Sequence, residues 1–410
     1  MPHPENGLSH DMKKVIPGLL FPLLGIAVTC IHFSPALSSV LLALVLILSL
    51  VCFKQSGKAA PLWSWFLPAL FVWQLTAQLM VGWQQGAADK ILLKLPLFFV
   101  PFLIAWAGRD EAGKHRLTTL LGVNLVHFWI ALASVFHYLA HFKFYNQMIL
   151  ESKPIPLFTQ VYHIEFSLML AVFALAGILH RRQRGHFVSE MLFWLSMVNL
   201  ILVFMISVRT GMLGVLCGLG LKLFWDMREN KRSRWLLTGL FVLAALAFLL
   251  VPALKNRLIN TIDDVKTIAS AGDVSEKSLG RRWVAWNVAI IASVDAPLSG
   301  FGMKGVEDAL GRGYEKQGNI LEESNRVMPH NEFLDLLLQS GWPAFILLFI
   351  VAIYMLLNLV KTSNGAGLAV WAALFSAACF ESYLERQAGV LLFVAACVLV
   401  LTAEKREIIA

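Results

Sequence analysis

The stretch PALSSVLLALVLILSLVCF, residues 35–53, decides the fold, because it contains no charged residue and is long enough to cross a membrane as a helix. An α-helix needs about 17 to 25 apolar residues to span roughly 30 Å of hydrocarbon, and it satisfies its backbone hydrogen bonds internally. Similar runs recur along nearly the whole chain of 410 residues, of which 58% are hydrophobic and 15% charged. Soluble domains are nearer half apolar and a quarter charged. The sequence therefore predicts an all-α polytopic membrane protein.

Run length, charge and the positions of proline and glycine predict about 12 transmembrane helices. These spans are residues 15–33, 35–53, 61–82, 91–107, 117–139, 161–179, 187–207, 211–226, 235–253, 341–360, 366–381 and 388–403. The first run follows Lys13 and Lys14 without a convincing cleavage pattern, so we expect it to remain as the first helix. The predicted parts are spans 1–9 in residues 1–253, a long helical periplasmic segment in residues 254–340, and spans 10–12 with a cytoplasmic tail in residues 341–410.

Basic residues collect in alternate connectors, and by the positive-inside rule those connectors face the cytoplasm. They include Lys13, Lys14, Lys54, Lys58, Arg109, Lys114, Arg116, Arg181, Arg182, Arg184, Arg228, Lys231, Arg232, Arg234, Lys361, Lys405 and Arg406. Both termini are therefore predicted to be cytoplasmic. The formal charge of +8 comes from short clusters of this kind, so it does not indicate a nucleic-acid partner. The five cysteines lie in apolar runs without metal-binding spacing, and we interpret them as core residues.

The outward connectors include a medium one near residues 140–160 and the long segment 254–340. Long segments between spans usually carry function rather than simply join helices. Apolar residues recur at helical spacing between Lys277 and Val294, and Pro297 and several glycines then interrupt the chain before His330. This pattern predicts two or three short helices on the outer face of the membrane.

Arg209 stands in the stretch Ser207–Gly211, between two apolar runs with almost no loop. A charged side chain at mid-membrane depth costs about 2.5 to 3.5 kcal/mol, so we expect Arg209 to face a wet or protein-lined cavity. One interpretation is a side chain that extends to the outer interface. The other is an anion site, because a guanidinium matches phosphate oxygens and Gly211 would let a large group approach the backbone.

Two adjacent arginines, Arg281 and Arg282, follow Ser278-Leu279-Gly280 at the start of the first expected outer helix. One of them can point to lipid headgroups and the other inward, and the sequence does not say which. Attraction to anionic lipid is the alternative role for both.

The stretch MPHNEFLDLLLQSGWP, residues 328–343, places a histidine and two acids directly before an apolar run. Pro329 discourages helix before it, and His330 or Asn331 can cap the helix that follows. A helix N-terminus favours anions and a neutral imidazole, which can act as a general base near pH 7. The alternative is a solvated cap at the water interface. Glu332 and Asp335 either orient the site or simply meet water.

Weaker candidates lie at two other outer positions. His163 and Glu165 enter the sixth predicted span from outside, where ionisable residues are suspected of function. Glu381, Glu385 and Arg386 in the last outer turn are expected to pair among themselves. Metal-ligand sets and nucleotide loops are missing from the sequence, so we predict no metal and no cofactor. The remaining candidates are basic residues and one histidine. They fit a donor with a phosphate leaving group, because arginines can neutralise the charge on the departing phosphate.

The order of these short motifs resembles that of the bacterial O-antigen ligases and the related O-antigen polymerases. The resemblance rests on Arg209-Thr210-Gly211 at the start of a span, on Ser278-Leu279-Gly280-Arg281-Arg282 in the outer segment, and on His330-Asn331-Glu332 before a helix that ends at Gly341. The twelve-span layout with inside termini is also similar, so the resemblance covers essentially the whole chain.

This resemblance implies a glycosyltransferase of the bacterial inner membrane, with its active site facing the periplasm. Its donor is a glycan on undecaprenyl pyrophosphate, its acceptor is a sugar hydroxyl of lipid A-core, and transfer inverts the anomeric centre without a metal. Arg209 and Arg282 would hold the pyrophosphate, and His330 would activate the acceptor hydroxyl. The expected substrate-binding residues are Arg281, Asn331, Glu332, Thr210 and His163.

Three alternatives stay open. An O-antigen polymerase would use a second lipid-linked repeat unit as acceptor, and a protein O-oligosaccharyltransferase would use a protein. A transporter or flippase for a lipid-linked anion would use Arg209 as a counter-charge, although the two similar halves common in transporters are not evident. Ligation is favoured because a single long outer segment carries both the Ser-Leu-Gly-x-Arg and the His-Asn-Glu forms.

Overall fold

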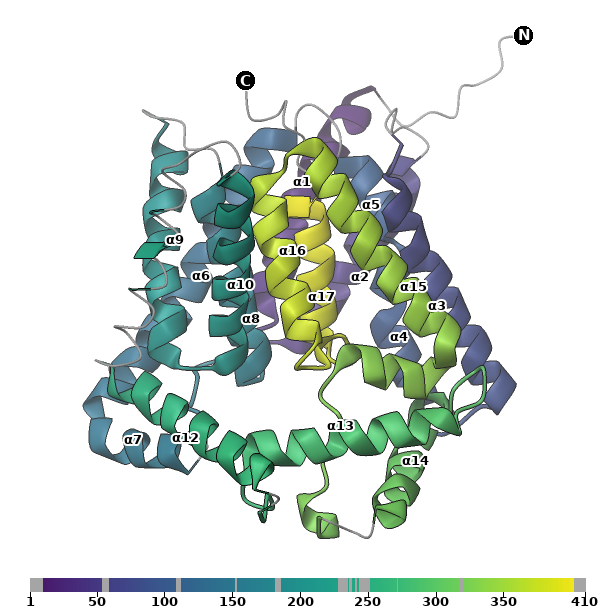
Figure 1. Ribbon diagram of the computed structural model, residues 1–410. Helices are drawn as coiled ribbons and strands as arrows, with labels where there is room; N and C mark the ends of the chain where they lie inside the picture. The colour runs from purple at the N-terminus through teal and green to yellow at the C-terminus, as the bar shows by residue number, and fades with distance from the viewer. Residues whose placement is uncertain are drawn as a thin grey trace.

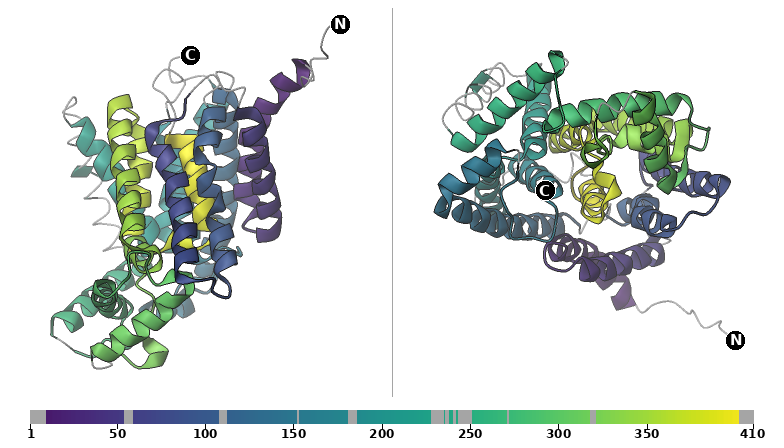
Figure 2. Two further views of the ribbon diagram at one scale, coloured as in Figure 1. Left: turned by 90° about the vertical axis from the view of Figure 1, so that its right-hand side faces the viewer. Right: turned by 90° about the horizontal axis from the view of Figure 1, so that it is seen from below.

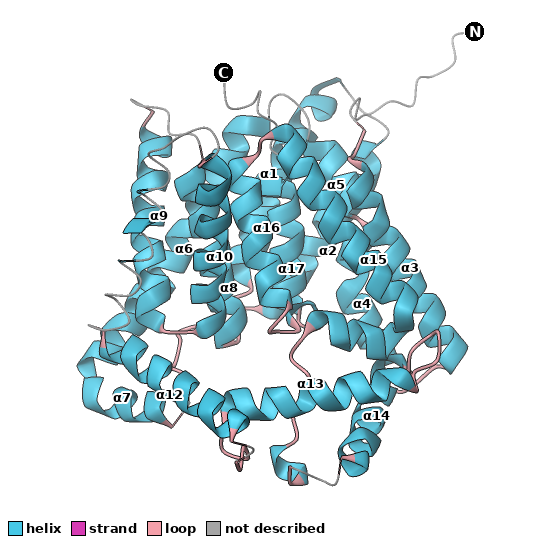
Figure 3. Ribbon diagram, viewed as in Figure 1, coloured by secondary structure: helices cyan, strands magenta, loops and turns pink. Residues whose placement is uncertain are grey.

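The computed structural model describes most of the chain. The described ranges are residues 10–53, 59–107, 112–151, 153–180, 186–227, 251–270, 272–317 and 321–401, together with residues 235, 238, 239 and 242. Within these ranges the regular structure is helical and contains no strand (Figure 3). The predicted all-α class is therefore confirmed for the described residues.

The main body is a bundle of roughly parallel and antiparallel helices (Figure 1). Its members are α1 (His10–Cys30), α2 (Pro35–Phe53), α3 (Leu62–Val81), α4 (Ala87–Phe98), α5 (Val100–Ala107), α6 (Ala112–Ala140), α8 (His163–Leu179), α9 (Phe187–Ile206), α10 (Arg209–Asp226), α15 (Glu332–Thr362), α16 (Gly365–Ala378), α17 (Gln387–Ala396) and the π-helical turn η3 (Cys397–Leu401). By length and composition, five helical segments can cross a membrane, namely 62–81, 87–107, 115–140, 187–206 and 332–362. Five shorter apolar helices accompany them.

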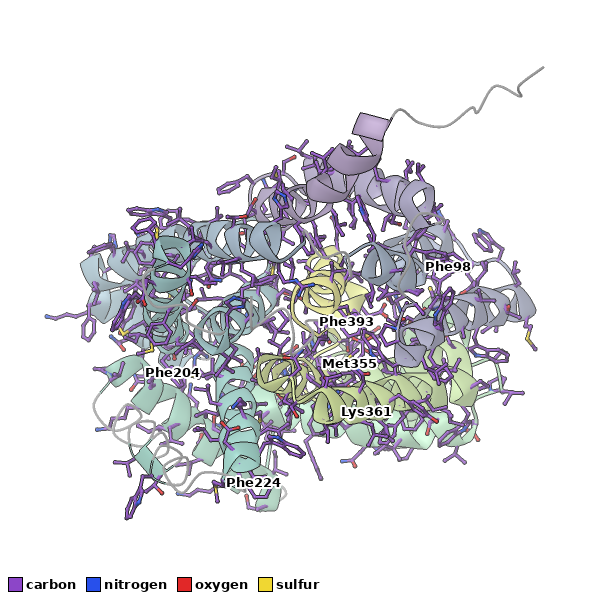
Figure 4. The ribbon with its side chains drawn as sticks, turned by 90° about the horizontal axis from the view of Figure 1, so that it is seen from above. Phe98, Phe204, Phe224, Met355, Lys361 and Phe393 are labelled. Carbon is purple, nitrogen blue, oxygen red and sulfur yellow. The ribbon has the colours of Figure 1, made fainter. Side chains whose placement is uncertain are left out.

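The bundle interior is formed by helices that are apolar on all sides. Every residue of α8 from Ile164 to Gly177 is buried, as is most of α16 and α17. Figure 4 views the bundle along its axis, with Met355 and Phe393 inside and Phe224 at the edge. Phe224 is 57% exposed. Apolar side chains on the outer surface as well as in the core are what a lipid-embedded bundle requires.

A second layer of helices lies across one end of the bundle. It consists of α7 (Phe142–Leu150), α12 (Pro252–Ala269), α13 (Ser278–Val294) and α14 (Gly302–Lys316), with the short η1 (Glu323–Asn325). Figures 1 and 2 show α12 and α13 running crosswise below the bundle and along one side of it. At the opposite end, α1 begins, α15 ends and η3 ends. The expectation of two or three short helices in the segment after residue 254 is thus met by α12, α13 and α14.

Several predicted boundaries differ from the structure. The predicted span 91–107 is two helices, α4 and α5, that meet at Phe99 after Pro96. The predicted span 235–253 lies largely outside the described residues, and α12 already begins at Pro252, so the expected boundary between residues 253 and 254 falls inside a helix. The predicted span 388–403 starts as α17 and continues as the η3 turn. The count of twelve spans remains a prediction.

The helix expected between His330 and Gly341 and the predicted span 341–360 follow each other directly and together form α15 (Glu332–Thr362). Gly341 interrupts it with φ 77° and ψ −176°, so the helix consists of two pieces that meet at a kink. A Cβ on Gly341 would lie 1.8 Å from the carbonyl oxygen of Leu298, which leaves room only for glycine. The first piece, ahead of the kink, carries the acids that follow His330.

Candidate active site

A cavity of about 460 Å³ lies where the bundle meets the crosswise layer. Its walls come from the N-terminal ends of α8 and α10, from α12 and α13, and from the loop after α16. Its polar lining includes Arg209, Arg257, Arg282, His163 and Glu381. Three guanidinium groups therefore line one hollow together with a single carboxylate.

Arg209 is the first residue of α10, and a tight connection places it there. Ser207 closes α9 in the left-handed region with φ 59°, Val208 is extended, and the next helix begins at once. The Nε and Nη2 atoms of Arg209 are buried and have no hydrogen-bond partner in the part of the chain that the structure describes. Leaving such donors unpaired is costly, so the site is suited to an anionic ligand that would accept from them.

Gly211 has a different role from the one expected. A Cβ at this position would lie 1.9 Å from Oγ of Ser167 and 2.7 Å from the Ser167 carbonyl oxygen. The glycine therefore allows α10 to pack closely against α8, and the idea that it admits a bulky ligand to the backbone is wrong. The close packing holds the N-terminal end of α10, where Arg209 lies, against α8.

Glu381 is the central acceptor of the site. Its Oε1 accepts hydrogen bonds from Nη1 of Arg282 at 2.7 Å and from Oγ1 of Thr210 at 3.4 Å, and Nη1 of Arg282 also donates to the Phe380 carbonyl at 2.9 Å. Burial opposes the charged form of Glu381, but hydrogen bonds from His330 and Arg282 outweigh it and hold the pKa of Glu381 below its usual value. Thr210, expected to touch substrate, lines the cavity but is engaged with this carboxylate.

His330 lies beside the cavity and faces the same carboxylate. Its Nδ1 is 3.4 Å from Oε2 of Glu381, and its side chain is partly exposed. The backbone of His330 has φ 47°, a conformation that non-glycine residues adopt uncommonly. Of the two expected caps, Asn331 is the one used, because its Oδ1 accepts from the backbone N–H groups of Phe333 and Leu334. His330 is thereby left free to turn toward Glu381.

The side chains that follow His330 secure the loop that carries Glu381. Asn331 Nδ2 donates to the Cys379 carbonyl at 2.9 Å, and Glu332 Oε2 accepts from the backbone N–H of Leu384 at 3.0 Å. Asp335 accepts from the Ser382 hydroxyl. Glu332 and Asp335 are both buried, so of the two alternatives left open for them, contact with water is wrong. They anchor residues 379–384, and neither they nor Asn331 lines the cationic cavity.

Lys94 completes this anchorage from α4. It is only 2% exposed, forms an ion pair with Glu385, and donates to Oε1 of Gln339 at 3.2 Å. Burial opposes ionisation of Glu385, but the charges of Lys94 and Lys90 outweigh it and keep the pKa of Glu385 below its usual value. No pattern in the sequence connects Lys94 with Glu385, which lies almost three hundred positions away.

The expected pairing within the last outer turn is wrong. Glu381 pairs with Arg282, and Glu385 with Lys94, as described above. Arg386 pairs instead with Glu165, at 3.3 Å from Nε to Oε1, and its guanidinium lies 4.2 Å from the Tyr162 ring centre. Each ionisable residue of the turn thus reaches a different helix. Of the suspected pair on α8, Glu165 is engaged by Arg386, and only His163 lines the cavity.

The two adjacent arginines of α13 are now distinguished. Arg282 lines the cavity, whereas Arg281 is not among the lining residues. The Nε of Arg281 is buried without a partner in the described parts of the chain. The placement supports Arg282 as the residue that faces a ligand and gives no support to Arg281.

Arg257 of α12 was not expected. It is 8% exposed and lines the cavity beside Leu258 and Thr261. A signal was present in the sequence, because Arg257 lies one helical turn beyond the buried Ala253 and Leu254 and so shares their face. A charged side chain on the buried face of an amphipathic helix is costly unless it meets a polar or charged group, so its presence there indicates a polar site.

A second, apolar cavity of about 590 Å³ adjoins the site. It is formed by side chains of α13, α15 and α16 that include Trp286, Phe333, Phe349 and Trp371. Asn331 and Cys379 lie on its wall, whereas Phe380 and Glu381 line the cationic cavity. The loop at residues 379–381 therefore lies between the two cavities.

The fold and the site define a multi-pass helical membrane protein with a cationic cavity under one end of its bundle. Residues 191–349 match a family model described as O-antigen ligase, and this match places the chain in the O-antigen ligase/polymerase superfamily. The matched region runs from α9 into α15 and includes Arg209, Arg282 and His330. A comparison with curated proteins found no match. Family membership implies a lipid-linked glycan donor and a lipid acceptor in the membrane.

Proposed function

We propose that this protein is an O-antigen ligase, which transfers a glycan from undecaprenyl pyrophosphate to a sugar hydroxyl of lipid A-core. In this proposal it spans the inner membrane about twelve times, with both termini cytoplasmic and the cavity facing the periplasm. The observation that carries it is that Glu381 contacts both Arg282 and His330 and lines one cavity with Arg209, although these residues come from segments far apart in sequence. The position of α12–α14 at the end opposite the start of α1 supports the orientation.

The arginines act on the leaving group. As the bond between the anomeric carbon and the phosphate oxygen breaks, negative charge grows on the pyrophosphate. The unpartnered Nε and Nη2 of Arg209 are placed to donate to it, and Arg282 contributes a second positive charge from across the cavity. Fixed donors in a water-poor cavity stabilise such charge more than water does. They would supply this stabilisation without a metal ion.

His330 acts on the acceptor. Its Nδ1–H can donate to Glu381, and this interaction fixes the tautomer in which Nε2 carries a free lone pair. Nε2 then takes the proton of the acceptor hydroxyl as its oxygen forms the new bond to the anomeric carbon. One bond forms as one breaks on the opposite face, so the configuration inverts. Glu381 stabilises the imidazolium that results.

Two lipid-anchored substrates must meet for this reaction, and holding them together removes much of the entropic barrier. The presence of a cationic and an apolar cavity on either side of residues 379–381 supports a site for two substrates.

The test uses purified protein with both lipid substrates. His330→Ala should lose transfer, by at least about a hundredfold for loss of a general base. Transfer near the wild-type rate would remove His330 as the base, and inhibition by a chelator that magnesium reverses would reject the metal-free route. A deletion strain separates the close alternatives. A ligase deletion leaves lipid-linked long polymer and no polymer on lipid A, whereas single repeat units on lipid A would identify a polymerase.

A further inference from the structure

Arg257 is a buried cation whose hydrogen bonds are incomplete. Its Nη2 donates to the Lys153 carbonyl at 2.8 Å, and its Nε is buried with no partner among the described residues. No ion pair between Arg257 and a carboxylate occurs in that part of the chain. A buried charge of this kind is normally paired, because an unpaired one is destabilising. The side chain is therefore positioned for a negative group that enters the cavity.

The cavity carries more positive than negative charge. Arg209, Arg257 and Arg282 line it, while the acids that act on them are Glu381 and Asp264. Glu381 is already bound by Arg282, and Asp264 accepts from the backbone N–H of Leu279 at 2.9 Å. An anion with more than one negative charge complements the positive charge that these two acids leave unbalanced.

The three arginines differ in their neighbours. Burial, and after it the neighbouring positive charge of Arg209, lower the pKa of Arg257 to about 10. Arg209 is in turn within electrostatic range of Arg282. Arg209 is thus within electrostatic range of both other arginines. The hydrogen bonds distinguish the two ends: Arg282 donates to Glu381, beside His330, where the glycan bond would break, whereas Arg257 donates to the Lys153 carbonyl.

We propose that Arg257 is a third anion-binding residue and that it holds the lipid-side phosphate of a diphosphate whose glycan-side phosphate lies at Arg282. This inference rests on the proposed function and deepens it, since it assigns the two ends of the donor. The apolar lining supports this orientation of the donor. Leu258 of α12, next to Arg257, and Leu213 and Leu216 of α10, one and two turns beyond Arg209, can contact its hydrocarbon chain. A diphosphate then contacts all three arginines, whereas a single phosphate contacts only some of them.

The experiment measures binding of inorganic pyrophosphate and of inorganic phosphate to the purified full-length protein by calorimetry. Both are also tested as inhibitors of transfer. The variants are Arg257→Gln and Arg257→Lys, with Lys255→Gln as the matched control, because Lys255 is exposed on the same helix and carries the same charge. Thermal unfolding of each variant verifies folding.

The wild type should bind pyrophosphate more tightly than phosphate. Arg257→Gln should weaken pyrophosphate at least about tenfold, as expected for loss of a charged hydrogen bond, with less than about twofold change for phosphate. Arg257→Lys should lie between, since it keeps the charge without the planar fork. Lys255→Gln should match the wild type. Unchanged pyrophosphate binding in both Arg257 variants overturns the proposal, and equal weakening of both anions overturns the assignment to a second phosphate.

Arg209→Gln distinguishes this inference from the function on which it rests. If Arg209→Gln loses pyrophosphate binding and transfer while Arg257→Gln keeps both, only the role of Arg257 is rejected. If the wild type neither prefers pyrophosphate nor transfers a glycan, the proposed function itself is rejected.

Discussion

The Nδ1 atom of His330 and the Oε2 atom of Glu381 lie 3.4 Å apart, and the second oxygen of Glu381 accepts from Arg282 at 2.7 Å. One carboxylate thus connects the residue proposed as base with a residue proposed to bind the leaving group. Both catalytic roles depend on the placement of a loop that is fixed by buried acids and a buried lysine.

Glu381→Gln should lower kcat for transfer about ten- to a hundredfold, as is typical for a group that orients a catalytic imidazole. The neutral amide keeps the size of the side chain but neither fixes the His330 tautomer nor stabilises the imidazolium. Steady-state kinetics with the purified protein measure this, with Glu315→Gln on the exposed surface of α14 as control. Equal kcat for Glu381→Gln and wild type would contradict the role of Glu381.

The pKa of Glu381 predicts a pH dependence of stability. Because the folded-state pKa is lowered, the charged carboxylate stabilises the fold above the unfolded pKa of about 4.3, and this contribution is lost as pH falls through the lower folded value. The difference in unfolding temperature between wild type and Glu381→Gln should stay constant from about pH 8 to about pH 5 and shrink below about pH 4. A difference that has already vanished at about pH 6 would contradict the sign of the shift.

Much of this site could be predicted from sequence because it consists of polar residues where apolar ones are expected. Arg209 interrupts two hydrophobic runs, and His330 precedes another, so both are conspicuous. Helical periodicity correctly predicted α13, which carries Arg282. Helical periodicity could not distinguish Arg281 from Arg282, because the distinction depends on which side of α13 faces the cavity. Only the motif resemblance favoured Arg282.

The partners of the site residues could not be predicted, because contacts between distant segments set them. Glu381, Glu385 and Arg386 are close in sequence, yet each pairs with a different helix. Periodicity rules apply within one element and do not extend to a turn of this kind. The role of Lys94 could likewise not be predicted, because its partner Glu385 belongs to a distant turn.

Gly341→Ala should destabilise the protein by several kcal/mol. An added Cβ would lie 1.8 Å from the Leu298 carbonyl oxygen, and φ of 77° is unfavourable for alanine. Gly311→Ala is the control, since the space around that α14 glycine is open and alanine favours a helix by about 1 kcal/mol. Thermal unfolding in detergent compares the two. Similar unfolding temperatures would show that the chain does not need the kink as described.

Lys94→Met should lower stability by about 3 kcal/mol, because it leaves Glu385 largely buried without its ion-pair partner. Lys90→Met should have a much smaller effect, as Lys90 is more exposed and lies 4.0 Å from the same carboxylate. The double variant Lys94→Met/Glu385→Gln should recover most of the loss, since it removes the unpaired charge. Transfer should follow the same order, because Glu385 lies in the loop that holds Glu381. Thermal unfolding and kcat, measured on the same samples, test both statements. If the double variant is no better than Lys94→Met, packing rather than charge explains the position of Lys94, and the ion pair does not fix the loop.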